Sequence, residues 1–176
     1  MGRAAGFDYQ RPRHIVGRIE RMNWLMKSEP DAFGIDDLKA CRGGIEPWDG
    51  IRNYQARNFM RDQMQVGDRA FFYHSNCKVP GIVGVMEIAS EAYPDPTQFD
   101  PKSNYFDVDS SPDEPRWLLV DVKYKRHTNR VISLNEIKAH ANQLDDFPLI
   151  RKGNRLSIIP VTDQQWDVLM RLEACD

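Results

Sequence analysis

Cysteine is scarce in this chain of 176 residues, which contains Cys41, Cys77 and Cys175 and no others. No two of them have C-x-x-C spacing, which excludes a zinc-binding pattern, and their odd number argues against a disulfide framework. Long apolar runs are also missing, so no membrane span of about 18 residues is expected. The N-terminus lacks the apolar segment of a secretory signal. These absences predict a reduced, intracellular protein without a metal, a cofactor or a membrane partner.

Positive charge shows no excess either. The chain carries 24 Lys and Arg residues against 26 Asp and Glu residues, which gives a formal net charge of −2 and a pI near 6.1. Proteins that bind nucleic acids non-specifically are usually basic, because they gain affinity by releasing counterions from phosphates. The composition therefore argues against that class. If this protein binds nucleic acid, it should do so through a local patch and a pocket.

Familiar catalytic motifs are absent as well. The sequence has no glycine-rich phosphate loop, no G-x-S-x-G and no H-E-x-x-H. The carboxylates Glu29, Asp49 and Glu87 are dispersed, and no second His or Cys has metal-ligand spacing with His74. The sequence therefore favours a binding protein over an enzyme. A hydrolase that uses His74 with Lys27 or Glu29 stays open as an alternative.

The length and the 41% hydrophobic content predict one packed domain. Residues 1–21 differ from the rest, because they carry five arginines against only Asp8 and Glu20. We predict a basic N-terminal extension over residues 1–21, flexible or preceding an alternative start at Met22, followed by a domain over residues 22–176. The other interpretation of the extension is a basic arm that touches a phosphate backbone.

Patterning predicts short strands separated by helices. Strands are expected at residues 23–27, 69–75, 82–92, 117–125 and 156–161, and helices at 35–41, 53–64, 134–141 and 163–173. Ser133 and Thr162 are the expected N-caps of the last two helices. The proline-rich residues 93–115 form a long loop, in which Tyr105 and Asp107 could make a flap. This arrangement predicts an α+β fold, a small bent β-barrel of about five to six strands decorated by helices.

Aromatic and polar side chains are mixed in residues 48–58 and 71–76. Aromatic rings can stack on the faces of a nucleobase, while amide, imidazole and hydroxyl groups can read its edge. The predicted base pocket consists of Trp48, Asn53, Tyr73, His74, Ser75, Ser28 and Trp117. Each has a plainer interpretation: the tryptophans as core, Asn53 as a helix cap and His74 as a structural hydrogen-bonding group.

A rim that binds phosphates is expected around this pocket. Its predicted members are Lys27, Arg52, Arg57, Pro80, Gly81 and Arg155. The free N–H groups at the start of the helix at 53–64 favour an anion beside its arginines, and a glycine permits close backbone approach. Alternatively, the arginines form surface ion pairs, and Lys27 pairs with Glu29.

Four segments carry a family resemblance: residues 24–30, residues 48–58, residues 71–76 with 80–84, and residues 155–161. They look like the EVE domain, with the closest likeness to the thymocyte nuclear protein type, over roughly residue 22 to the C-terminus. EVE domains are related to PUA-like folds and to the YTH modules that read methylated adenine. The resemblance implies a PUA-like barrel in which Trp48 is one wall of an aromatic cage.

The resemblance also implies the task, which is non-catalytic binding of a modified nucleobase. The base would be a modified cytosine in DNA, such as 5-methylcytosine or its oxidised forms, or a modified RNA base, flipped into the pocket. The expected partner is nucleic acid, and a monomer is favoured. The expected compartment is the cytoplasm if the source is bacterial and the nucleus if it is eukaryotic. The alternatives are a nucleotide- or nucleic-acid-directed hydrolase and an adaptor protein whose pocket stays empty.

Overall fold

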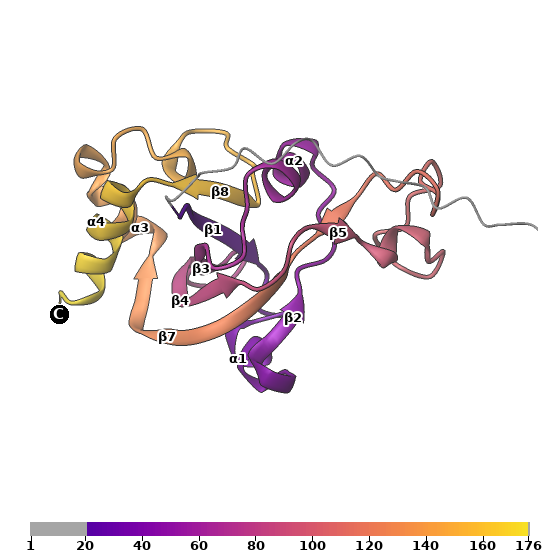
Figure 1. Cartoon of the computed structure of the whole chain (residues 1–176). Helices are drawn as coiled ribbons and strands as arrows, with labels where there is room; N and C mark the ends of the chain where they lie inside the picture. Colours follow the sequence, from indigo (N-terminus) through magenta and orange to yellow (C-terminus); the bar gives the residue numbers. More distant parts are fainter. Residues whose placement is uncertain (1–20, 176) are drawn as a thin grey trace, which may run out of the picture.

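The computed structural model describes residues 21–175, so the predicted extension over residues 1–21 lies outside the described part except for Arg21. The described residues form a six-stranded sheet, a two-stranded ladder and four α-helices. The sheet curls into a half-barrel with helices packed on it (Figure 1). The predicted α+β class and bent barrel are therefore confirmed. None of the helices within residues 21–175 is long and apolar enough to cross a membrane.

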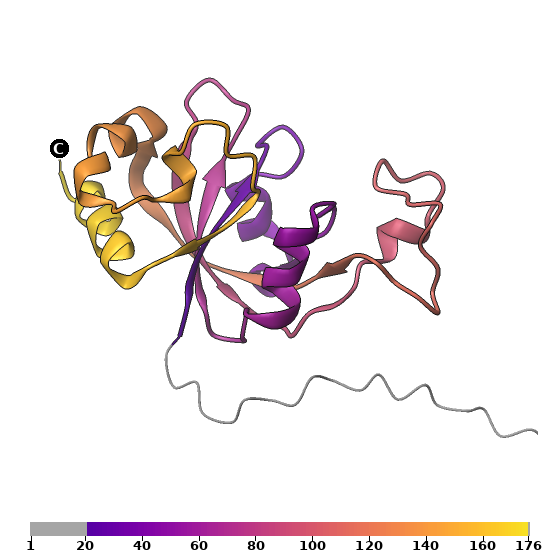
Figure 2. The ribbon, with the colours of Figure 1, turned by 90° about the horizontal axis from the view of Figure 1, so that it is seen from above.

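The sheet has the strand order β2-β7-β4-β3-β1-β8. Its strands are β1 (Asn23–Ser28), β2 (Ile45–Pro47), β3 (Arg69–His74), β4 (Gly81–Ile88), β7 (Asp121–Ser133) and β8 (Ile158–Val161). β3 and β4 form an antiparallel hairpin, whereas β1 and β3 are parallel neighbours. The separate ladder joins β5 (Tyr93–Pro94) to β6 (Leu118–Leu119), at the base of the proline-rich loop that projects beyond the second helix (Figure 2).

Hydrophobic cores lie on both faces of the sheet, because successive side chains of a strand point to opposite sides. Trp24, Met26 and Phe72 face a cluster that includes α1 (Ile35–Ala40) and α2 (Tyr54–Asp62). Leu25 and Phe71 face a second cluster with α3 (Leu134–Ala139) and α4 (Asp163–Glu173). The sheet is thus covered by a hydrophobic core on each face.

Capping side chains set the starts of three helices. Asn53, Ser133 and Thr162 each accept a hydrogen bond from the backbone N–H three residues later, as N-caps do. The two predicted caps, Ser133 and Thr162, are therefore confirmed, and α4 has the predicted bounds. α2 is shorter than predicted, because Asn53 is its cap and Gln63 leaves helical geometry with φ −124°.

The strand predicted at residues 82–92 ends at Ile88 in the structure, and a second predicted strand is also wrong in its extent. The pattern placed a strand at residues 117–125, but β7 runs on to Ser133. The chain breaks between β6 and β7 at Val120, whose carbonyl accepts a hydrogen bond from the Trp48 N–H. Residues 125–130 are mainly polar, so they show no apolar alternation. Pairing with β4 holds this segment in the sheet instead.

Candidate functional site

Polar side chains gather where β1 and β3 end. Because these strands are parallel, their carboxyl ends meet at one edge: Lys27 lies opposite Tyr73, and Ser28 opposite His74. The Ser75 N–H donates to the Ser28 carbonyl at 2.9 Å. We call this group the strand-end cluster; it comprises Lys27, Ser28, Tyr73, His74, Ser75, Pro80 and Gly81. The structure thus brings together seven of the predicted site residues.

Two members of the cluster hold the loop that follows β1. The Ser28 hydroxyl donates to the Phe33 carbonyl at 2.7 Å, and the His74 Nε2 accepts from the Ile35 N–H at 3.2 Å. An acceptor nitrogen carries no proton, so His74 is neutral with its proton on Nδ1. Burial lowers the pKa of His74, which favours the same neutral form. His74 therefore has one structural nitrogen and one donor that no residue of the described chain uses.

Lys27 is a half-buried cation. Burial lowers its pKa, and none of residues 21–175 forms an ion pair with it; its Nζ lies 6.0 Å from the centroid of the Tyr73 ring. Glu29, the partner weighed from the sequence, accepts instead from the Asn76 amide at 2.6 Å. Burial also raises the pKa of Tyr73 to about 12, so its hydroxyl stays protonated. An ammonium group without a carboxylate partner is suited to contact an anion.

Trp48 lies in the core beside the strand-end cluster and is only 6% exposed. Its ring meets Phe72 edge to face at a centroid distance of 5.2 Å. Phe72 meets the His74 ring in the same manner at 5.5 Å. Trp48 is thus a buried support behind His74, and a base that stacks on it would first have to open this packing. Its predicted role as a cage wall stays a prediction.

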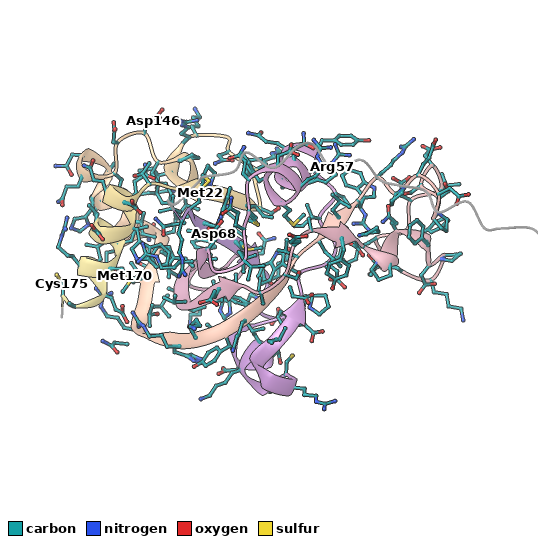
Figure 3. The ribbon with its side chains drawn as sticks, in the orientation of Figure 1. Met22, Arg57, Asp68, Asp146, Met170 and Cys175 are labelled. Carbon is teal, nitrogen blue, oxygen red and sulfur yellow. The ribbon has the colours of Figure 1, made fainter. Side chains whose placement is uncertain are left out.

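Arginine and aromatic side chains form a second group, which we call the arginine–aromatic ladder. It comprises Tyr105, Arg52, Trp117, Tyr54 and Arg57. The Arg52 guanidinium lies 5.4 Å from the Tyr105 ring centroid and 5.6 Å from that of Trp117. Trp117 stacks on Tyr54 at 4.8 Å, and the Arg57 guanidinium lies 4.7 Å from the Tyr54 ring. The predicted residues Arg52, Arg57 and Trp117 thus lie in one stack with Tyr54 and Tyr105. Figure 3 labels Arg57, which lies in α2.

Arg52 uses every donor it has inside the protein. Its Nε donates to the Tyr105 carbonyl, one terminal nitrogen donates to the Ile51 carbonyl and Asp95, and the other donates to Thr97 and the Tyr105 carbonyl. A guanidinium has five N–H groups, so none is left for a phosphate while these bonds hold. Arg52 therefore serves as a clamp between residues 51–52 and loop 95–116.

Asp95 is the buried partner in this clamp and has no exposed surface. Burial alone would raise its pKa, but hydrogen bonds from Thr97, Arg52 and the Gly50 N–H outweigh that effect and lower the pKa. Sequence reasoning missed Asp95. The one local signal for Asp95 is Thr97, two residues later. The Asp95 carboxylate accepts hydrogen bonds from the Thr97 N–H at 2.8 Å and from the Thr97 hydroxyl at 2.6 Å, as in an Asx turn.

Loop 95–116 covers the segment after Trp48. The Tyr105 ring lies over Gly50, which has a positive φ of 78°; a β-carbon there would be 2.6 Å from the ring. The Trp117 indole N–H donates to Asp107 at 2.7 Å. Tyr105 and Asp107, the expected flap residues, thus fasten the loop over residues 50–52 and the ladder.

The other predicted residues lie apart from these contacts. Asn53 accepts the Ala56 N–H at 3.0 Å, which makes it the cap of α2. Arg155 is exposed two residues before Ser157, whose carbonyl accepts the Lys27 N–H. Among residues 21–175, no group of three or more His, Cys, Asp or Glu side chains is arranged to hold a metal ion.

Comparisons with known proteins agree with this architecture. The sequence profile described as the EVE domain matches residues 22–172. Thymocyte nuclear protein 1 from Gallus gallus is 47% identical over 171 residues, which is 89% of this chain and 70% of that protein. The human protein of the same name is 46% identical over 166 residues, 86% of this chain and 73% of that protein.

Solved structures are similar over nearly the same span. A human THYN1 protein in complex with 5-methylcytosine containing DNA has a TM-score of 0.81 and 45% identity, and the match covers 88% of this chain and 99% of that one. A Pseudomonas putida protein also has a TM-score of 0.81, with 48% identity and coverage of 86% and 99%.

Proposed function

The chain belongs to the EVE domain family, and we propose that it binds a modified nucleobase in nucleic acid, first of all 5-methylcytosine in DNA, without altering it chemically. The observation that carries the proposal is the likeness to the human protein solved with 5-methylcytosine containing DNA, at 45% identity and a TM-score of 0.81. The strand-end cluster supports it, because it combines the Lys27 cation, which has no ion-pair partner within residues 21–175, with hydrogen-bond donors and acceptors.

A base in a duplex is stacked and paired, so a pocket can reach it only after the nucleotide turns out of the helix. Flipping requires a few kcal/mol, which pocket contacts must offset. In the proposed complex, Lys27 contacts a phosphate next to the flipped nucleotide, with Arg155 nearby. His74, Ser28 and Ser75 lie closer to the base. The neutral His74 offers its Nδ1–H, while its Nε2 keeps the Ile35 N–H in place.

The predicted ladder residues receive a supporting part in this proposal. Arg52 and Trp117 hold loop 95–116, and Arg57 donates to the Arg116 carbonyl and to Asn58. With their donors used inside the protein, they shape the wall of the site rather than grip phosphate. Trp48 supports His74 through Phe72 and becomes a stacking surface only if the packing around it opens.

The test is a binding titration at one stated salt concentration. Matched DNA and RNA oligomers, single- and double-stranded, carry cytosine or 5-methylcytosine at one position. We expect tighter binding to a 5-methylcytosine DNA, and analysis of the recovered oligomer should show no product. Equal, weak binding to all oligomers would overturn the proposal. The RNA arm decides whether the partner class extends beyond DNA, and product formation would favour the hydrolase alternative.

A variant pair localises the phosphate contact. Lys27→Met keeps the volume of the side chain but removes its charge, whereas Lys152→Met removes an exposed lysine far along the chain. Loss of one phosphate contact should weaken binding to all sequences and reduce the slope of log affinity against log salt by about 1. We expect that change for Lys27→Met and none for Lys152→Met. Equal slopes in both variants would remove Lys27 from the rim.

A further inference from the structure

The loop that spans residues 95–116 exposes apolar side chains. Tyr105 is 43% exposed, Phe106 42% and Val108 80%, and Val108 is the most exposed large hydrophobic side chain within residues 21–175. The loop projects from the body of the domain beyond α2 (Figure 2), and neither Phe106 nor Val108 belongs to either hydrophobic core. Apolar side chains that gather on an exposed surface mark a site of interaction with another molecule.

Gln98 holds this loop in shape from within and has no exposed surface. Its amide group donates to the Asp95 and Trp117 carbonyls at 2.6 and 2.8 Å. Its side-chain oxygen accepts from the Trp117 N–H at 3.0 Å and from the Ser110 hydroxyl at 2.5 Å, and its carbonyl accepts from the Asp107 N–H at 3.0 Å. The loop is thus pre-organised, so a partner that binds it need not order it first.

Negative charge surrounds the apolar side chains. Residues 99–115 contain one lysine, Lys102, against five carboxylates: Asp100, Asp107, Asp109, Asp113 and Glu114. Arg116 lies 4.0 Å from Asp107 and 3.6 Å from Asp109. The other three carboxylates are exposed, and none of residues 21–175 forms an ion pair with them. Such a surface repels a phosphate backbone and attracts a positively charged peptide.

We propose that the loop tip, defined as residues 100–114, binds a basic segment of another protein. The segment would be an extended stretch of arginines and lysines that includes one aromatic or aliphatic side chain. Arginine suits this surface, because its planar guanidinium pairs with carboxylates through two parallel hydrogen bonds and stacks on aromatic rings. Phe106 and Val108 contact the apolar side chain of the partner, while Asp113 and Glu114 contact its cations.

The exposed apolar surface of the loop tip is small, which predicts a weak complex. Interfaces below about 1,200 Å² are typical of transient encounters, and salt screens charge pairs that are exposed to solvent. We therefore expect an affinity that falls as the salt concentration rises, with a partner that binds and leaves quickly.

The loop tip and the strand-end cluster share no residue, so a protein partner and a nucleic acid can be bound at the same time. A domain that binds a base without altering it produces an effect only through what it brings to the nucleic acid or keeps away from it. A second surface for a protein partner supplies that link. Each of the two surfaces can be tested without the other.

Amide chemical shifts of the isotope-labelled full chain are recorded during titration with a set of probes. These are a short synthetic peptide of arginines and lysines around one phenylalanine, the same peptide with alanine in place of phenylalanine, a peptide of glutamates around one phenylalanine, and a single-stranded DNA oligomer. We expect saturable shifts of residues 100–114 with the basic peptide, and weaker binding once its phenylalanine is replaced. The glutamate peptide and the DNA should leave these amides unchanged.

A pair of matched variants tests the charge. Asp113→Asn together with Glu114→Gln removes two carboxylates from the loop tip with little change of shape. Asp31→Asn together with Asp167→Asn makes the same change of net charge at exposed positions elsewhere. At low ionic strength we expect the loop variant to bind the basic peptide about tenfold more weakly, and the control to bind nearly as the wild type. All four side chains are exposed, so the melting temperatures should not change.

Val108→Ser tests the apolar contact. It should weaken binding of the peptide that contains phenylalanine and leave binding of the alanine peptide unchanged, because only the first peptide loses an apolar contact. Equal weakening of both peptides would show that Val108 does not contact the phenylalanine.

Equal binding of the basic and glutamate peptides would overturn the proposal, as would unchanged affinity in the Asp113→Asn, Glu114→Gln variant. Shifts of residues 100–114 by the DNA oligomer would make the loop tip a nucleic-acid surface instead. Residues 1–21 of this chain are also basic. If Arg11→Gln with Arg13→Gln shifts the amides of residues 100–114 without any peptide, that segment is the occupant and the proposed partner is wrong. Failure of every 5-methylcytosine oligomer to bind, with the basic peptide still bound, would refute the proposed function alone.

Discussion

Replacing Arg52 by alanine tests whether this residue clamps loop 95–116 rather than binding phosphate. The variant loses all the hydrogen bonds that Arg52 makes with Ile51, Asp95, Thr97 and Tyr105. It also removes the cation beside a carboxylate that has no exposed surface. We therefore expect a large loss of stability, together with a loop that no longer packs on Gly50.

The magnitude follows from the burial of the pair. Breaking a buried ion pair by removing one partner costs about 3–5 kcal/mol, because the other charge stays desolvated. Asp95 keeps its bonds from Thr97 and the Gly50 N–H, which places the expected loss near the lower limit, at about 3 kcal/mol. Urea unfolding followed by tryptophan fluorescence measures it, since Trp117 belongs to the same stack.

Arg151→Ala is the matched control. Arg151 also pairs with one aspartate, Asp146, through two hydrogen bonds of 2.8 and 2.6 Å, whereas Arg52 makes one to Asp95 at 2.9 Å. That pair differs in exposure, since its side chains are 54% and 73% exposed, against 21% and 0% for Arg52 and Asp95. Exposed pairs contribute little to stability, so this variant should unfold nearly as the wild type does.

A result in which Arg52→Ala loses no more stability than Arg151→Ala would refute the clamp. A double-mutant cycle with Asp95→Ala adds a second check, because residues in contact should show a coupling energy of about 0.5–3 kcal/mol. Nucleic-acid binding gives the functional readout. A clamp variant should lose affinity at every salt concentration, whereas the loss of a phosphate contact would reduce the salt dependence.

Two further predictions concern backbone packing and pH. In thermal unfolding, Gly50→Ala should destabilise the protein more than Gly153→Ala. Both glycines have φ near 78°, but only an alanine at position 50 would press its β-carbon into the Tyr105 ring. Equal losses of stability in the two variants would show that the Tyr105 ring moves aside without cost. His74 has a lowered pKa in the folded protein, so its contribution to stability is present above pH 6.5 and is lost as the pH falls through the folded pKa. Urea midpoints should therefore decline on acidification as the Ile35 N–H bond breaks, and a His74→Gln variant with the same decline would contradict this assignment.

Local signals were sufficient for the elements that the sequence predicted well. The apolar stripe of α2, the caps Ser133 and Thr162 and the whole of α4 depend on residues within one or two helical turns. Alternation along β3 places Tyr73 and His74 on opposite sides of the sheet, with Tyr73 in the second core and His74 against Phe72. Such patterns can be recognised in a sequence because the interactions that cause them join residues that are close together along the chain.

Local sequence patterns could predict the candidate site only in part. Residue types at positions 27–28 and 73–75 indicated a polar cluster, and the parallel pairing of β1 with β3 joins them. Arg52 was expected at a phosphate, because an arginine near a helix start looks the same whether or not its donors are used. Its buried partner Asp95 lies 43 positions away, and no local pattern links the two.

The sequence by itself determined the order of the four α-helices and most of their bounds, and which segments are rich in polar and aromatic groups. Tertiary structure alone decided which polar groups meet, which arginines are already satisfied and where space remains. The irregular pairing at Val83 depends on strand register, since residues 128–131 lie opposite Val83 alone. Register, burial and unpaired hydrogen-bonding groups are set by contacts between distant segments, so they appear only when the chain is folded.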